Sequence, residues 1–242
     1  IPSIPGWFAA WNDQYGAKIK GRFYKNDGTA IDNNDRSLQF DSPLGQQQRP
    51  KLLMLTNGNI AVAIQANNGA VDTSSWSTHM KIVQMTGPAT APTGFTTIVA
   101  QKLINSGYTA SHQYDPILLG LPSVTSGARF VALIWSYGPD GSGYTIRGQV
   151  YKEDGTLVGA EKTLNSNTNQ DQIAPRCFVW DNGKNIFCVW QDKSGVLDGT
   201  AGQEGIVGGR FDEDLVAMGS DFLINTLHKT GSQVSPTIAG GL

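Results

Sequence analysis

The residue types that build metal centres are scarce in this sequence, which has two cysteines and three histidines. Two cysteines cannot complete a zinc site alone, and the histidines lie far apart with no H-E-x-x-H pair. No apolar run approaches the roughly 18–20 residues that a membrane span needs. Nucleotide-binding loops of the Walker type and the G-x-S-x-G nucleophile motif are also missing. We therefore expect neither a membrane span nor the nucleotide-binding or nucleophilic chemistry that these motifs support.

Strong charge of either sign is absent as well, because 18 Lys and Arg stand against 20 Asp and Glu. A nucleic-acid partner normally requires a basic face, so this balance argues against one. Glycine is abundant, at 29 of 242 residues. Together with many β-branched and aromatic residues, this indicates an all-β chain that is rich in turns.

An internal repeat of about 60 residues runs through the chain. Four prolines, each preceded at three positions by a glutamine, recur in register: Gln47 and Pro50, Gln113 and Pro116, Gln172 and Pro175, Gln233 and Pro236. Two further repeated positions hold Trp11, Trp135 and Trp190, with Ile64 in the remaining unit, and Asn105, Asn165 and Asn225. The tryptophans alternate with apolar residues, so we expect them in the core.

Each unit contains four short strands with Asn-Gly or Asp-Gly turns between them, which is typical of a propeller blade. The sequence therefore predicts a single four-bladed β-propeller with four antiparallel strands per blade. The expected blades are residues 1–46 plus 234–242, 47–110, 111–170 and 171–233. A stacked solenoid is the competing interpretation, although its repeats usually have fewer strands.

The first unit lacks its first strand, and the C-terminal segment from Ser235 to Leu242 matches that strand. We expect this segment to complete the first blade and close the ring within one chain. Two alternatives remain open: donation of the strand to a neighbouring chain, or a longer array of which these residues are an excerpt.

The two cysteines, Cys177 and Cys188, flank an Asn182-Gly183 turn. Residues opposed across such a hairpin have numbers summing to 365, and 177 + 188 meets this condition. We expect a disulfide, which would favour an oxidising compartment. The alternative is two small buried hydrophobic residues.

The stretch DGSGYTIRGQVYKEDGTLVGAEKTLNSNTNQDQIAP, followed by FVWDNGKNIFCVWQDKSG, resembles the propeller-like repeats of large secreted bacterial proteins that also carry RTX-type calcium-binding regions. The resemblance is good over residues 113–242, fair over 1–50 and poor over 65–105. It implies an extracellular or surface-exposed, non-catalytic module linked to adhesion and to calcium. The RTX nonapeptide itself is absent.

Carboxylate pairs for glycoside hydrolysis are not evident, because the repeated acids Asp27, Asp154 and Asp212 fall in turns, where Asp caps its own backbone. Four blades also leave a narrow axial channel. We therefore expect no enzymatic activity.

The Gly-rich loops between strands offer oxygen ligands for calcium from Asp140, Asp198 and Glu204. The alternative is an ordinary polar loop, and the absence of D-x-D-x-D spacing favours it.

The remaining candidates are residues for sugar binding, where a ring stacks on the sugar and carboxylates bind its hydroxyls: Tyr15, Tyr137, Tyr144, Asp13 and Asp192. The sequence thus predicts an extracellular or cell-surface module that binds a glycan or matrix component in a lectin-like way. The alternative is a self-assembling filament or surface-layer subunit, joined by exchange of the C-terminal strand.

Overall fold

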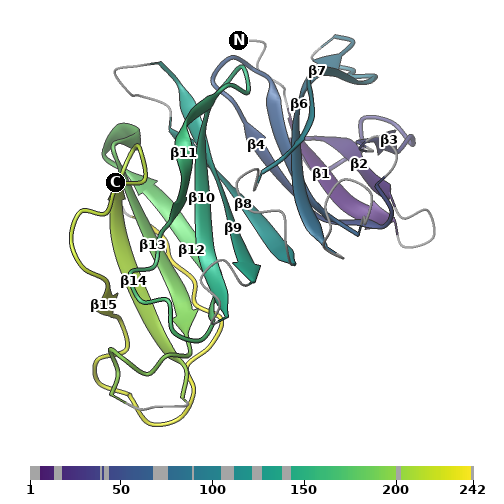
Figure 1. Ribbon diagram of the computed structural model, residues 1–242. Coiled ribbons are helices and arrows are strands. Elements are labelled where there is room, and N and C mark those ends of the chain that lie inside the picture. The colour runs from purple at the N-terminus through teal and green to yellow at the C-terminus, as the bar shows by residue number, and fades with distance from the viewer. Residues whose placement is uncertain are drawn as a thin grey trace.

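The computed structural model of the chain consists of four antiparallel β-sheets, which we call blades A to D (Figure 1). It describes residues 6–13, 18–38, 40, 44–67, 76–88, 90–104, 112–121, 127–137, 143–199 and 203–240. In this part of the chain there is no helix long and apolar enough to cross a bilayer. The predicted all-β, propeller-like fold is confirmed.

The strands of every blade follow one another in chain order. Blade A contains β1 (Gly6–Asp13), β2 (Lys18–Lys25) and β3 (Arg36–Ser37). Blade B contains β4 (Gln47–Met54), β5 (Ile60–Ala66), β6 (Ser77–Thr86) and β7 (Gly94–Leu103). Blade C contains β8 (Gln113–Leu121), β9 (Arg129–Tyr137), β10 (Tyr144–Lys152) and β11 (Leu157–Thr163). Blade D contains β12 (Gln172–Trp180), β13 (Asn185–Asp192), β14 (Gly205–Asp212) and β15 (Phe222–Leu223), with the short 3-10 turn η1 (Asp181–Gly183) between β12 and β13.

The predicted turns form as their residue types require. The Asp27 carboxylate accepts the N–H of Thr29, and the Asp154 carboxylate accepts that of Thr156. The following glycines, Gly28 and Gly155, have φ angles of 84° and 81°, which glycine adopts at no steric cost. These turns set the register of the outer strands.

Apolar clusters lie between successive blades. Trp190 and Phe211 of blade D pack with Leu133 and Ile146 of blade C, and blades A and B meet around Ile19 and Ile64 in the same way. The repeated aromatic position is therefore buried where an earlier blade covers it, as at Trp190, which is fully buried. Trp11 is 36% exposed, against our expectation, because in the described chain no blade precedes blade A.

Paired asparagine and glutamine amides connect blade C to blade D, and blade D to residues 233–240. The Asn165 side chain accepts the N–H of Ile146 in β10 and donates to the side-chain carbonyl of Gln172 at the start of β12. Asn225 repeats the arrangement with Ile206 and Gln233. These contacts explain why asparagine and glutamine recur in register.

The first strands of blades B, C and D lie on the inside of the array, where β8 contacts both β4 and β12. In each of them the residue before the repeated proline is left-handed, with φ of 53° at Arg49, 48° at Asp115 and 52° at Ala174. The strand register shifts at the same place, so each inner strand carries a bulge near its start.

Ser235 has the same backbone conformation, with φ of 56°. Its N–H donates to the Gln191 side chain, and the N–H of Gln233 donates to the Glu204 carbonyl. The earlier blades make the equivalent contacts between Asp115 and Gln65 and between Gln113 and Trp76. The C-terminal segment, residues 233–240, therefore lies where the inner strand of a further blade would lie.

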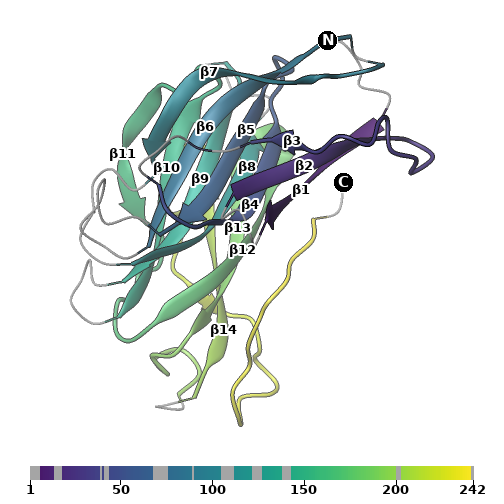
Figure 2. The ribbon, with the colours of Figure 1, turned by 90° about the vertical axis from the view of Figure 1, so that its right-hand side faces the viewer.

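This placement differs from the predicted closure of the ring. Within the described residues β1 pairs only with β2, and residues 233–240 join no ladder with it. Figure 1 shows blade A and the C-terminal segment at opposite sides of an open array, and Figure 2 shows the C-terminal trace drawn without strand arrows beyond blade D. The reason is local: Gln191 and Glu204 of blade D fix the segment, and blade A is not beside them.

Candidate functional site

The predicted site residues that the structure describes lie at one end of the blades. Inner strands begin at this end, and because the strands are antiparallel, the second strands finish and the third strands start there too. Gln172 is opposite Asp192, and Tyr144 is opposite Tyr137. We call this the proximal end of the array, and the other the distal end.

The bulged residues of two neighbouring inner strands face one another at the proximal end. The Arg49 guanidinium lies 3.5 Å from the Asp115 carboxylate. Two further cations reach the same carboxylate, with the Lys51 ammonium at 3.7 Å and the Arg176 guanidinium at 3.9 Å. These four residues, which we call the Asp115 cluster, combine side chains from blades B, C and D.

The backbone positions Asp115 by two means. Its left-handed φ turns the side chain out of the normal strand alternation, and its N–H is held by the Gln65 side chain at 3.3 Å. The Asp115 side chain is 13% exposed, whereas those of Arg49 and Arg176 are about half exposed, at 53% and 45%. The Asp115 carboxylate is thus largely buried and held by its backbone, whereas the cations around it are exposed to solvent.

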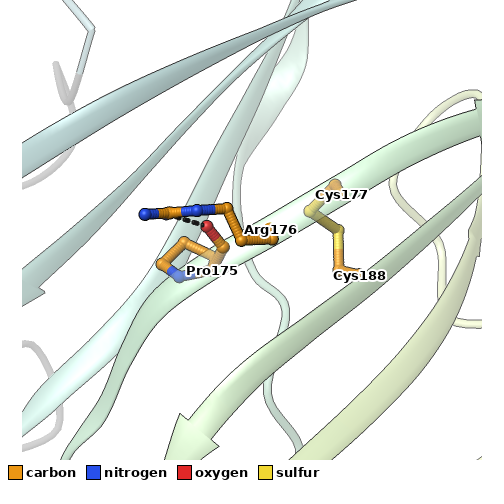
Figure 3. Close-up of a disulfide and its surroundings, with 4 residues drawn as sticks. All are labelled: Pro175, Arg176, Cys177 and Cys188. Atoms are coloured by element: carbon orange, nitrogen blue, oxygen red, sulfur yellow. Dashed lines mark hydrogen bonds between the residues drawn. A yellow bond between two sulfur atoms is a disulfide. The ribbon is translucent and has the colours of Figure 1, made fainter. Parts of the chain in front are cut away.

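Arg176 also donates a hydrogen bond to the Pro175 carbonyl at 2.7 Å. Figure 3 shows its side chain bent over Pro175 and directed away from the disulfide. The Cys177–Cys188 bond follows directly in the strand, which confirms the predicted pairing and its register. The connection between the paired strands is wider than the predicted two-residue turn, since it contains all of η1.

The other predicted site residues are distributed around the proximal end rather than brought together. Asp13 pairs with Lys20 at 2.8 Å. The Tyr144 ring lies 5.8 Å from the Tyr114 ring, centroid to centroid. The backbone N–H of Tyr144 donates to the Asp171 carboxylate. Tyr15 lies outside the described residues, and of Tyr137 only the backbone in β9 is described.

Asp192 is almost fully buried, at 4% exposed, and accepts the N–H of Ser194. Burial raises the pKa of its carboxyl, and the nearby negative charge of Asp198 acts in the same direction. This carboxyl is well placed to hold a proton, but not to present charge to solvent.

The calcium expectation stays a prediction. Asp140 lies outside the described residues, and Glu204 pairs with the Lys193 ammonium at 3.5 Å. Lys193 also contacts Asp171 at 3.1 Å, and the hydrogen bond from Asp171 raises the pKa of this lysine. The Lys193 ammonium therefore already offsets negative charge at Glu204 and Asp171. In the described ranges no group of three or more His, Cys, Asp or Glu could hold a metal ion.

The Asp115 cluster was not found from the sequence. A usable signal existed, because the residue before the repeated proline changes from Arg49 to Asp115, Ala174 and Ser235 while the backbone stays the same. Variable side chains on a repeated backbone are typical of a binding position.

Known family models and curated sequences give no match to this chain. Solved structures do match. An endo-arabinase from Bacteroides thetaiotaomicron has a TM-score of 0.56 and 18% identity, over 90% of this chain and 75% of that one. An exo-1,5-alpha-L-arabinanase from a bovine ruminal metagenomic library has a TM-score of 0.52 and 11% identity, over 93% and 76%. The arabinanase Arb43A of Bacillus subtilis has a TM-score of 0.50 and 13% identity, over 93% and 78%.

These matches overturn the predicted function. The expected non-enzymatic adhesion or lectin-like module was wrong, and so was the alternative of a self-assembling structural subunit, because the solved structures reported above are an endo-arabinase and two arabinanases. The sequence argument failed at its assumption about the ring. We expected four blades closed around a narrow channel, whereas the four blades form an open array in which the Arg49 and Arg176 side chains are about half exposed at the proximal end.

Proposed function

We propose that this chain is a glycoside hydrolase that cleaves a polysaccharide at the proximal end of the blades, with Asp115 as a reacting carboxylate. The observation that carries this proposal is the place of Asp115. It is the only carboxylate in β4, β8 and β12, the three inner strands, in a fold whose solved examples include arabinan-cleaving enzymes.

Glycoside hydrolysis normally needs two carboxyl groups, one acid and one base or nucleophile. Asp115 suits the second role, because it is anchored by its backbone and faces an accessible rim of donors. The acid has to come from the same end of the blades. Of the predicted carboxylates described there, Asp13 and Asp192 are the two sugar-binding candidates, and the raised pKa of Asp192 is the property that a general acid requires.

The test is release of reducing ends from a panel of polysaccharides that includes arabinan. We expect Asp115→Asn to lower the rate by about 100-fold or more, the usual contribution of a positioned acid or base. Asp181→Asn is the matched control, because Asp181 lies at the distal end in a left-handed position that asparagine also favours. Asp13→Asn and Asp192→Asn then identify the acid.

Two results would overturn the proposal. One is that the wild-type chain cleaves no polysaccharide in the panel. The other is that Asp115→Asn and Asp181→Asn cleave at the wild-type rate.

We also propose an extracellular or cell-surface location. The disulfide supports it, because such bonds persist in oxidising compartments. Fractionation of the source cells, followed by detection of the chain with an antibody, tests this directly; recovery in the reducing cytosol would exclude it.

A further inference from the structure

We infer that the Asp115 cluster binds an acidic polysaccharide, and that Arg49, Lys51 and Arg176 hold the carboxylate or sulfate group of one of its sugars. The inference names the substrate class of the proposed glycoside hydrolase and rests on that function for its setting. It is carried by the charge, spacing and exposure of the cluster.

The three cations lie on two sides of the Asp115 carboxylate. Arg49 and Lys51 belong to β4 of blade B, and Arg176 belongs to β12 of blade D, with Asp115 of blade C between them. Three inner strands therefore contribute to one small area. A ligand bound there would contact all three blades at once.

The positive charge of the cluster exceeds what Asp115 can neutralise. Among the described residues, Asp115 is the single acidic partner of each of the three cations, so two positive charges remain in excess. The whole chain carries a formal net charge of −2. The excess is thus a local feature, and it does not follow from the overall composition.

The ion pairs in the cluster are also loose. Their separations of 3.5, 3.7 and 3.9 Å are longer than the 2.7–2.9 Å of a charge-assisted hydrogen bond. The cations consequently retain donors that can turn toward a second anion. Lys51 is 42% exposed, and both arginines are more exposed still, so an incoming group can reach them.

Arginine is the side chain best matched to such a group, because its planar donors bind two oxygens of a carboxylate or sulfate together. A neutral polysaccharide offers only hydroxyl groups, which do not require three cations. The geometry therefore favours an acidic sugar, with the ionised group above the cations and the glycosidic bond near Asp115.

The experiment measures binding of the full chain to polygalacturonate, to dextran sulfate and to neutral arabinan by affinity electrophoresis at low and at moderate salt. We expect one or both polyanions to bind, with affinity that falls as salt rises. Preference for polygalacturonate identifies a carboxylate, and preference for dextran sulfate identifies a sulfate.

The triple variant Arg49→Gln, Lys51→Gln, Arg176→Gln should weaken binding by about tenfold or more, since each removes one exposed ion pair with the ligand. Its control is Lys152→Gln, Lys184→Gln, Arg210→Gln, which removes three exposed cations from the distal end. Thermal unfolding checks that both variants remain folded. Asp115→Asn should strengthen polyanion binding, because it removes the one negative charge of the cluster, while it lowers the rate of cleavage as stated above.

Equal loss of binding in the two triple variants would overturn the inference, because the attraction would then be nonspecific. Binding of arabinan as tight as that of both polyanions would overturn it too. The two proposals can fail independently. Cleavage of a neutral polysaccharide without polyanion binding would reject only the acidic substrate class. Specific polyanion binding without any cleavage would reject only the proposed hydrolase activity.

Discussion

The side-chain carbonyl of Gln191 accepts the backbone N–H of Ser235 at 3.4 Å. Gln65 holds the N–H of Asp115 in the same way, although Asp115 lies in a complete blade and Ser235 does not. Blade D alone therefore holds the C-terminal segment in the place of an inner strand, although the described residues of the segment join no ladder. Gly240 continues this contact, since a Cβ at this position would meet the Phe178 ring.

Deleting residues 234–242 should lower the free energy of unfolding by about 1–3 kcal/mol, because the Gln191 amide and the face of Phe178 lose their cover. Hydrogen exchange should accelerate in β13 and stay unchanged in β1. If the ring closed in solution, β1 would lose protection to the same extent, and our description of an open array would be wrong.

The Asn165 side chain should contribute more to the free energy of unfolding than Asn225, its counterpart in the next repeat. Asn165→Ala leaves the buried N–H of Ile146 without its acceptor, which costs about 1–3 kcal/mol. Asn225→Ala removes the same contact from Ile206 at a half-buried site, where water can replace it, so we expect less than half that loss. Urea unfolding of both variants measures the difference; equal losses would contradict the role of burial.

Reduction of the disulfide should destabilise the chain by about 2–3 kcal/mol, because the bond closes a short loop between residues 11 apart. The comparison is urea unfolding with and without a reductant. A Cys177→Ala, Cys188→Ala variant serves as the control, and its midpoint should not respond to reductant. A wild-type midpoint that ignores reductant would show that the bond is absent in solution.

His79 should make stability fall as the solution is acidified. The ring is 1% exposed and contacts the Ser77 hydroxyl at 2.7 Å, and burial lowers its pKa from 6.5 to about 4. Between these values the unfolded chain binds a proton that the folded chain does not, so protonation favours unfolding by up to about 3 kcal/mol. The loss begins below pH 6.5 and is complete near pH 4.

His79→Gln provides the control for this pH dependence. Asp192 acts in the opposite direction, because its raised pKa favours the folded state on acidification. The difference between the wild-type and His79→Gln stability curves therefore isolates the histidine. If the stability curves of the wild type and of His79→Gln run parallel from pH 7 to pH 4.5, His79 does not cause the loss of stability on acidification.

The repeat and the register were predictable because they depend on contacts close in sequence. The pairing of Cys177 with Cys188 follows from counting residues on either side of a turn, and the turns at Asp27 and Asp154 follow from Asx and glycine chemistry. Nothing beyond a single blade was needed for these predictions.

The site was not predictable in the same way, because it depends on contacts between blades. Arg49 and Arg176 each lie more than 60 residues from Asp115 in the sequence, and only the packing of neighbouring blades brings each of them within 4 Å of its carboxylate. The exposure of Trp11 has the same origin, since it depends on which blade covers it. The predicted closure failed because a matching strand sequence does not determine which neighbour the strand meets.

The inter-blade contacts have a consequence for unfolding. Described hydrogen bonds between blades join neighbours in chain order, as Arg36 does with Pro92, Thr56 with Glu153, and Ser166 with Asp221. Stability in such a one-dimensional array is a sum of nearest-neighbour terms, and cooperativity decays with distance along it. Blades B and C, which each have a neighbour on both sides, should then lose hydrogen-exchange protection last, and the terminal blades A and D should lose it first.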